Sequence, residues 1–183
     1  MVIACCDSRV SPNMVLQSRP GDVFTVRNIA NLVPPYAGSG VTAGTSAALE
    51  YAVKVLGVEH IIVMGHSGCG GIKALMGEKF EGVEAFDANA FSSTDFVGQW
   101  MNVGLPARTK VNMIMPNAKF EDKCACLEQE AINTSLSNLL SFPFIKDKVT
   151  EGSLSIHGWY YDFVNMKLKT WSEDIIVSET MEI

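Results

Sequence analysis

Two short clusters in the sequence offer side chains that bind a soft or borderline metal ion. The first is CCDSR at residues 5–9, and the second is HSGCGG at residues 66–71. Thiolates and imidazole suit zinc, and the spacing His-x-x-Cys lets both side chains reach one ion from a single turn. Three protein ligands leave one position of a zinc tetrahedron open, which is typical of a catalytic site. The clusters therefore predict a catalytic Zn²⁺ site on His66, Cys69 and one thiol of the first cluster.

The first cluster also carries an acid and a base beside its two thiols. Neighbouring residues of a strand point to opposite faces, so only one of Cys5 and Cys6 can reach the ion. Asp7 and Arg9 are two residues apart, which places them on the same side of an extended segment where they can pair. An arginine keeps such a carboxylate ionised, and the carboxylate can orient a water molecule on the metal. The alternative is a purely structural ion pair.

Short apolar strands position both clusters. Hydrophobic runs lead directly into each one, at residues 2–4 and 60–64. In an open parallel sheet this places both clusters at the carboxyl ends of strands, where such folds hold their sites.

We expect a turn at 11–13 and a loop over 33–44. The predicted strands are Met1–Cys5, Asp22–Val26, Ile61–Met64, Ser153–Trp159 and Lys167–Trp171, the last at the sheet edge. The predicted helices are Thr45–Leu56 (ended by Gly57), Gly70–Met76, Ser93–Val103, Cys124–Leu140 and a short one from Pro143. This alternation predicts an α/β fold with a mainly parallel central sheet flanked by helices.

Composition limits the classes of protein to which the chain can belong. The length of 183 residues predicts a single domain over 1–183. A net charge of −6 argues against a nucleic-acid partner, and no apolar run approaches the roughly 20 residues of a membrane span. Five cysteines are an odd number and too few for a disulfide framework, which favours metal ligation in a reducing compartment.

The remaining cysteines and histidines, and an arginine–asparagine pair near the site, are expected to have structural roles and not catalytic ones. Cys124 and Cys126 fall on a predicted helix, where their side chains diverge, so we expect ordinary thiols. His60 opens a strand and His157 lies within one, and both are expected to be structural or surface residues. The Arg27–Asn28 pair ends a strand near the site and is expected to brace the adjoining loop.

The motifs resemble those of the β-class carbonic anhydrases, specifically the plant and algal type. The family pattern is Cys-x-Asp-Ser-Arg followed by His-x-x-Cys, and the two clusters fit it without gaps. The likeness continues through PGD (20–22), VRNIAN (26–31), EYAV (50–53) and YYDFV (160–164).

The resemblance implies a role for each site residue. It selects Cys5, with His66 and Cys69, as the zinc ligands and leaves Cys6 as a small buried filler. It implies that Asp7 and Arg9 are catalytic: the arginine holds the carboxylate off the zinc, and the carboxylate accepts a hydrogen bond from zinc-bound water. In other members this aspartate ligates zinc in a closed state, and the sequence leaves that alternative open. The implied substrate-binding residues are Phe24, Tyr51, Gly70 and Gly71, the first two partly across a subunit interface.

The implied activity is that of a carbonate dehydratase, a zinc lyase. It hydrates CO₂ reversibly to bicarbonate and a proton through zinc-bound hydroxide. One alternative is hydrolysis of CS₂ or COS on the same zinc, and another is a non-catalytic domain stabilised by zinc. The resemblance also implies a homodimer or a higher homo-oligomer. Family members carry an N-terminal helical arm ahead of the first strand, so we expect this chain to be truncated and to lack any targeting segment. A soluble intracellular protein is expected, in the cytosol, the chloroplast or another organelle.

Overall fold

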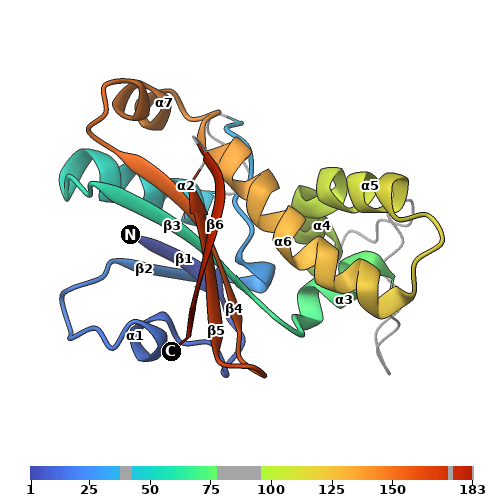
Figure 1. Ribbon diagram of the computed structural model, residues 1–183. Coiled ribbons are helices and arrows are strands. Elements are labelled where there is room, and N and C mark those ends of the chain that lie inside the picture. Colours follow the sequence, from blue (N-terminus) through green and yellow to red (C-terminus); the bar gives the residue numbers. More distant parts are fainter. Residues whose placement is uncertain (38–42, 78–95, 173–174, 183) are drawn as a thin grey trace.

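A single mixed sheet organises the chain. The computed structural model describes residues 1–37, 43–77, 96–172 and 175–182. Within them, six strands are ordered β2-β1-β3-β4-β5-β6 (Figure 1). The first four strands in the chain pair in parallel, and the last two are antiparallel additions. The strands are β1 (Val2–Cys5), β2 (Thr25–Asn28), β3 (His60–His66), β4 (Ser155–Asp162), β5 (Lys167–Ser172) and β6 (Ile175–Glu182).

The apolar runs of the central strands are buried because the sheet is covered on both faces. All four residues of β1 are buried, as expected for an inner parallel strand. Helices α2 (Ala43–Glu50), α6 (Phe120–Leu139) and α7 (Pro143–Thr150) contribute to the hydrophobic cluster on one face. The opposite face packs against a smaller cluster that includes Val15 of the short helix α1 (Pro12–Val15).

A third group of elements closes the carboxyl ends of the parallel strands. It consists of the 3-10 turn η1 (Ile29–Asn31) and of α3 (Gly70–Met76), α4 (Phe96–Met101), the 3-10 turn η3 (Asn102–Gly104) and α5 (Leu105–Ile114). Figure 1 shows α3, α4 and α5 grouped beside α6, at one side of the sheet. Their shared core cluster contains both Cys5 and Cys69. The packing therefore brings the two sequence motifs into one buried region.

The predicted α/β fold with a mainly parallel sheet is confirmed, and several boundaries differ. The turn expected at 11–13 is the first part of α1, because Pro12 takes the first helical position, where its missing N–H costs nothing. Asp22 accepts the Arg19 N–H in a turn, so β2 begins three residues later than predicted, at Thr25. The helix expected over 45–56 divides into α2 and a π-helical segment, η2 (Tyr51–Val55), before Gly57 at φ +62°.

Two elements were missed, and one was placed wrongly within the sheet. Lys167–Trp171 is a strand but not the edge, because β6 pairs with its outer side. Neither β6 nor α5 was predicted. The helix expected over 93–103 is seen from Phe96 onward, and its first three residues lie outside the described residues. No helix in the described ranges combines the length and the apolar character that a bilayer crossing needs.

Candidate metal centre

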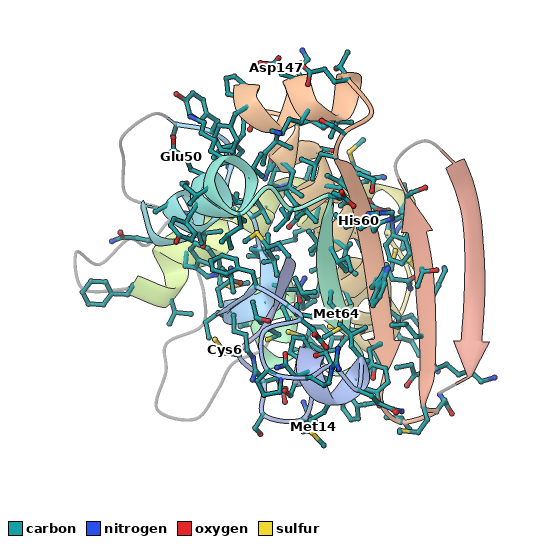
Figure 2. All side chains as sticks on the ribbon, turned by 90° about the vertical axis from the view of Figure 1, so that its left-hand side faces the viewer. Cys6, Met14, Glu50, His60, Met64 and Asp147 are labelled. Carbon is teal, nitrogen blue, oxygen red and sulfur yellow. The ribbon has the colours of Figure 1, made fainter. Side chains whose placement is uncertain are left out.

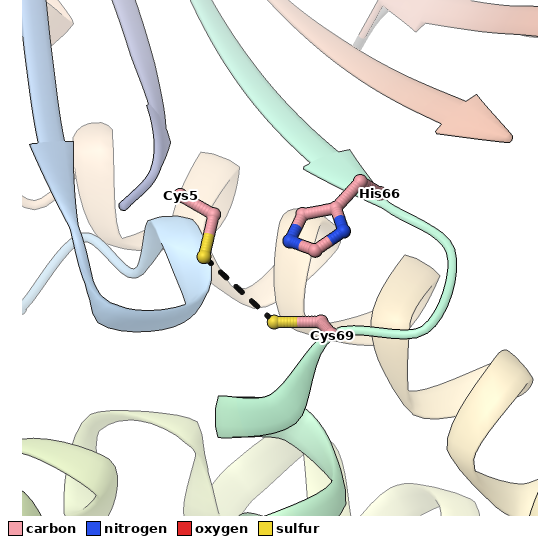
Figure 3. Close-up of side chains that lie close together, drawn as sticks. All are labelled: Cys5, His66 and Cys69. Atoms are coloured by element: carbon pink, nitrogen blue, oxygen red, sulfur yellow. Dashed lines mark hydrogen bonds between the residues drawn. The ribbon is translucent and has the colours of Figure 1, made fainter. Parts of the chain in front are cut away.

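Cys5, His66 and Cys69 converge at the carboxyl ends of two adjacent strands. Cys5 is the last residue of β1, His66 is the last residue of β3, and Cys69 follows on the turn into α3. The Sγ atoms of Cys5 and Cys69 are 3.9 Å apart, and one ligand atom from each of the three residues lies within 4.8 Å of the others. All three are buried (Figure 3). Parallel pairing of β1 with β3 therefore builds the cluster that the sequence spacing predicted.

The donor set and its spacing fit a zinc ion. His66 Nδ1 lies 2.9 Å from the Ser67 carbonyl oxygen, which assigns the proton to this nitrogen and leaves Nε2 with a lone pair. Nε2 is buried and has no hydrogen-bond partner. A tetrahedral zinc with Zn–S bonds of about 2.3 Å would hold two sulfur atoms about 3.8 Å apart. The observed separation and the orphaned nitrogen are both what a zinc ligand set requires.

The two thiols are electrostatically unequal without a metal. The pKa of Cys5 lies well below its ordinary value because the Cys69 thiol donates a hydrogen bond to it, and His66 lies close by. The same interaction and burial raise the pKa of Cys69. Burial alone would lower the pKa of His66, but its contacts with Cys5 and the Ser67 carbonyl raise it. The interaction between the two sulfur atoms therefore favours the thiolate on Cys5, and a divalent cation would favour the second thiolate.

Two glycines shape the turn that carries His66 and Cys69. Gly68 has φ +62°, a conformation that favours glycine. A Cβ on Gly71 would lie 2.9 Å from Ile29 Cγ2 and 3.1 Å from Ala30 Cβ, so any larger residue would have to displace these side chains of η1. Gly70, by contrast, faces open space at the start of α3. The close packing of this turn therefore depends on Gly68 and Gly71, whereas Gly70 has room for a side chain.

Asp7 and Arg9 form a bidentate ion pair beside the cluster. Arg9 Nε donates to Asp7 Oδ1 at 2.9 Å, and Arg9 Nη2 donates to Asp7 Oδ2 at 2.6 Å. The Arg9 backbone N–H also donates to Oδ1 at 3.0 Å. These hydrogen bonds lower the pKa of the Asp7 carboxyl well below its usual range. Asp7 is therefore held as an ionised acceptor.

Arg27 and Asn28 brace the loop that follows β1. Arg27 Nε donates to the Cys5 carbonyl oxygen at 2.8 Å, and its Nη2 donates to that of Asp7 at 2.6 Å. The Asn28 side-chain amide donates to the Leu32 carbonyl oxygen at 2.9 Å. This loop-bracing role is confirmed. Cys6 is exposed rather than a buried filler, and it lies one residue beyond the end of the buried strand β1.

Glu128 is a site residue that the sequence analysis missed. It lies on α6, is only 4 % exposed, and accepts the Cys69 backbone N–H at 3.0 Å. Its other carboxylate oxygen accepts the Tyr160 hydroxyl at 2.7 Å. Burial raises the pKa of Glu128, although these two hydrogen bonds oppose that shift. The available clue was an acid next to Leu127 and Ala131, within the apolar stripe of α6.

The four residues expected to bind substrate fall in two places. Gly70 and Gly71 are the first two residues of α3 and follow Cys69 directly, close to the ligand cluster. Phe24 precedes β2 and pairs with Val2 at the amino end of the sheet, and its ring stacks at 6.0 Å on that of Tyr51. Tyr51 is 49 % exposed. Within one chain the two aromatic residues are therefore not brought to the ligand cluster.

The comparisons with known proteins agree on one family. A family model described as carbonic anhydrase matches residues 1–168. Beta carbonic anhydrase 5, chloroplastic, from Arabidopsis thaliana is 48 % identical over 97 % of this chain. Beta carbonic anhydrase 3 from the same organism is 44 % identical over 95 %. The chain spans 56 % and 64 % of the lengths of these two relatives.

Solved structures show the same likeness. The structure of the β-carbonic anhydrase CcaA superposes with a TM-score of 0.85 at 32 % identity, covering 100 % of this chain and 77 % of that one. One of two tetrameric β-carbonic anhydrases from Sordaria macrospora gives a TM-score of 0.77 at 26 % identity, covering 97 % and 80 %.

Proposed function

Because this chain belongs to the β-carbonic anhydrase family, we propose that it is a zinc-dependent carbonate dehydratase that converts CO₂ and water reversibly to bicarbonate and a proton. One observation carries the proposal. A buried Cys-His-Cys cluster with an orphaned imidazole nitrogen lies beside a bidentate aspartate–arginine pair. A structural zinc site normally has four protein ligands, and it has no use for an ionised acid next to it. The proposed ligands are Cys5, His66 and Cys69.

Zinc would supply the nucleophile in this reaction. In the familiar three-histidine carbonic anhydrases, the bound metal lowers the pKa of its water to about 7, so that hydroxide is available at neutral pH. Two thiolates give an ion of lower effective charge than three histidines do, so more help from neighbouring residues is needed.

Asp7 and Arg9 are proposed to give that help. Asp7 is the ionised acceptor that takes a hydrogen bond from the attacking water and orients its lone pair. Arg9 holds both carboxylate oxygens, which keeps Asp7 in its charged form and away from the ligand positions. Gly70 and Gly71 are proposed to line the substrate site at the start of α3, where the backbone N–H groups of Gly71 and Ile72 also favour the Cys69 thiolate.

The aromatic pair Phe24 and Tyr51 fits a role across a subunit interface. The two rings stack on each other at the amino end of the sheet, and Tyr51 is half exposed. The Sordaria macrospora relatives are described as tetrameric. We therefore propose a homo-oligomer in which Phe24 and Tyr51 contribute an apolar wall to the neighbouring chain's CO₂ site.

Stopped-flow CO₂ hydration with zinc-quantified protein tests the proposal. Asp7→Asn should lower the hydration rate by about 10- to 100-fold, as loss of a partner outside the ligand set typically does, while zinc content stays the same. Asp22→Asn is the control, because Asp22 pairs with Arg19 through one longer and more exposed contact and is not part of the Cys-His-Cys cluster, so it should leave the rate unchanged.

Two results would overturn the proposal in different ways. Stoichiometric zinc without CO₂ hydration in the unsubstituted protein would favour hydrolysis of CS₂ or COS, or a structural zinc domain. Equal rates in Asp7→Asn and Asp22→Asn would remove Asp7 from the reaction.

A further inference from the structure

The ion pair between Asp7 and Arg9 needs more support than its own two charges provide. The Arg9 side chain is 51 % exposed, whereas that of Asp7 is 17 % exposed. An exposed ion pair gains little free energy, because solvent screens the charges and a long side chain loses conformational freedom. A pair that must hold a carboxylate in one orientation therefore requires additional contacts on the arginine.

Phe163 provides such a contact on the face of the guanidinium. The Arg9 Cζ atom lies 4.5 Å from the centroid of the Phe163 ring, within the range of a cation–π interaction. Arg9 Nη2 also donates to the Gly68 carbonyl oxygen at 3.1 Å. Arg9 is thus held by Asp7, by the turn that carries Cys69, and by an aromatic ring from a distant part of the chain.

Phe163 itself is anchored to the ligand turn. Its backbone N–H donates to Ser67 Oγ at 3.2 Å, and its ring lies 6.2 Å from the His66 ring. The Phe163 Cζ atom lies 3.7 Å from the position that a Cβ on Gly68 would take, so the ring lies next to this turn. Asp162 Oδ1 accepts the backbone N–H of Val164 at 3.0 Å, which fixes the turn between β4 and β5. The ring is therefore set by the same backbone that places His66.

We propose that Phe163 is a positioning residue that fixes the Arg9 guanidinium and, through it, the Asp7 carboxylate relative to the ligand turn. The effect of Phe163 on catalysis rests on the proposed function, whereas its positioning of Arg9 does not. The ring face holds the cation in the plane that permits two parallel hydrogen bonds to Asp7. Without the ring, Arg9 would keep its charge and lose its fixed orientation.

Phe163→Leu tests this role, with Phe163→Tyr as the conservative rescue. Leucine fills much of the volume but has no ring face, so kcat/KM for CO₂ hydration should fall about two- to fivefold, the range of an exposed cation–π contact. Tyrosine keeps the ring face, and its kcat/KM should stay near that of the unsubstituted protein. Val164→Ala, at the adjacent and 72 % exposed position, is the matched control and should change nothing.

A second readout does not depend on activity. The Arg9 Nε–H resonance in ¹H–¹⁵N spectra should be slow to exchange in the unsubstituted and Phe163→Tyr proteins, and faster in Phe163→Leu. Zinc content should be equal in all three. This pattern would support positioning of Arg9, even if the unsubstituted protein did not hydrate CO₂ and the proposed function failed.

The proposal is overturned if Phe163→Leu leaves both the Arg9 resonance and kcat/KM unchanged. It is equally overturned if Phe163→Leu and Phe163→Tyr lose zinc or unfold to the same extent, because the residue would then serve only to pack the turn.

Discussion

Strand β3 begins with one histidine and ends with another, and the two ends have opposite chemistry. At the amino end, His60 Nδ1 lies 2.6 Å from Ser155 Oγ, and His157 Nε2 lies 2.9 Å from the same oxygen. At the carboxyl end, His66 Nε2 is buried without any partner, beside two thiols. Figure 2 shows His60 toward Asp147 of α7, whereas Cys6 lies toward Met14 at the other end of the sheet. Of the two ends of β3, the carboxyl end is the one at which a buried histidine nitrogen has no partner.

A histidine is identified as a metal ligand by a buried ring nitrogen that has no hydrogen-bond partner. The residue type alone does not identify it. Both ends of β3 combine histidine with small polar neighbours. The two histidines at the amino end share a hydroxyl that satisfies one nitrogen of each ring. Burying a nitrogen without a partner costs free energy, so an orphaned buried nitrogen indicates a missing ligand.

The sharpest test of this difference is the removal of one side chain from each end. Cys69→Ala should weaken zinc binding by more than about 100-fold, since loss of a residue that merely supports a ligand already costs 10- to 100-fold. Catalysis should be lost with the metal. His60→Ala should leave the zinc stoichiometry and the hydration rate unchanged. Metal content after dialysis, measured by mass spectrometry, would contradict the comparison if both variants kept zinc or both lost it.

At each end of β3, one polar side chain bonds two partners: Glu128 at the carboxyl end and Ser155 at the amino end. Removing these side chains should give the next largest effect. Glu128→Ala leaves the buried Cys69 N–H and the part-buried Tyr160 hydroxyl without an acceptor, at about 1–3 kcal/mol for a fully buried group and less for the hydroxyl. We expect the free energy of unfolding to fall by about 3 kcal/mol. Ser155→Ala removes the corresponding partner at the amino end, where the exposed His60 can bind water instead, and should cost about 1 kcal/mol.

Urea denaturation of zinc-loaded protein measures both losses, and Glu128→Gln refines the result. Glutamine still offers an oxygen to the Cys69 N–H, so this variant should recover part of the stability. Equal losses for Glu128→Ala and Ser155→Ala would show that burial does not distinguish the two ends.

The sequence was sufficient for His66, Cys69 and one of the two adjacent thiols because their geometry follows from local rules, whereas the choice of Cys5 over Cys6 came from the family resemblance. Apolar runs before Cys5 and His66 made adjacent parallel strands, and such strands end at the same edge of the sheet. The spacing from His66 to Cys69 then fixed the turn. These features depend on residues that are close in sequence, or on one pairing of strands.

The parts that were missed depend on contacts between distant segments. Glu128 meets Cys69 only because α6 packs across β3 and β4, and no local pattern reports that. Strand β6 is the exception, because it pairs with β5, its neighbour in the chain, and this local pairing decides which strand is the edge. Phe24 was not among the missed residues: it was expected to reach a substrate site partly across a subunit interface, and its place at the amino end of the sheet within one chain leaves that expectation a prediction.

Close packing at the carboxyl end predicts an effect of intermediate size. Gly71→Ala places a methyl group 2.9 Å from Ile29 Cγ2 and 3.1 Å from the buried Ala30 Cβ, so we expect a loss of about 1–2 kcal/mol in unfolding free energy. Gly70→Ala is the matched control, because nothing lies within 4 Å of its added Cβ, and alanine favours the helix by about 0.5–1 kcal/mol. Thermal or urea unfolding that ranked Gly70→Ala below Gly71→Ala would contradict the packing.

The smallest expected effect concerns pH at the amino end of β3. Burial, and repulsion from His60, lower the pKa of His157 below its ordinary value. The unfolded chain therefore binds more protons at this residue than the native chain does as pH falls through about 6.5, where free histidine titrates. The contribution of His157 to the free energy of unfolding should therefore be greatest above about pH 6.5 and should decline as the pH falls below it.

His157→Gln should flatten this part of the profile of unfolding free energy between pH 7 and pH 5. His60→Gln should weaken the slope only partly, because it removes the repulsion from His60 and leaves the burial of His157 in place. Urea unfolding across this range, taken as the difference between each variant and the unsubstituted protein, isolates the contribution of His157 from that of other titrating groups. A steeper profile in His157→Gln would mean that His157 is charged in the native protein. The amino end of β3 would then hold a charged group without an opposite charge beside it. The two ends of the strand would no longer differ in the way described above.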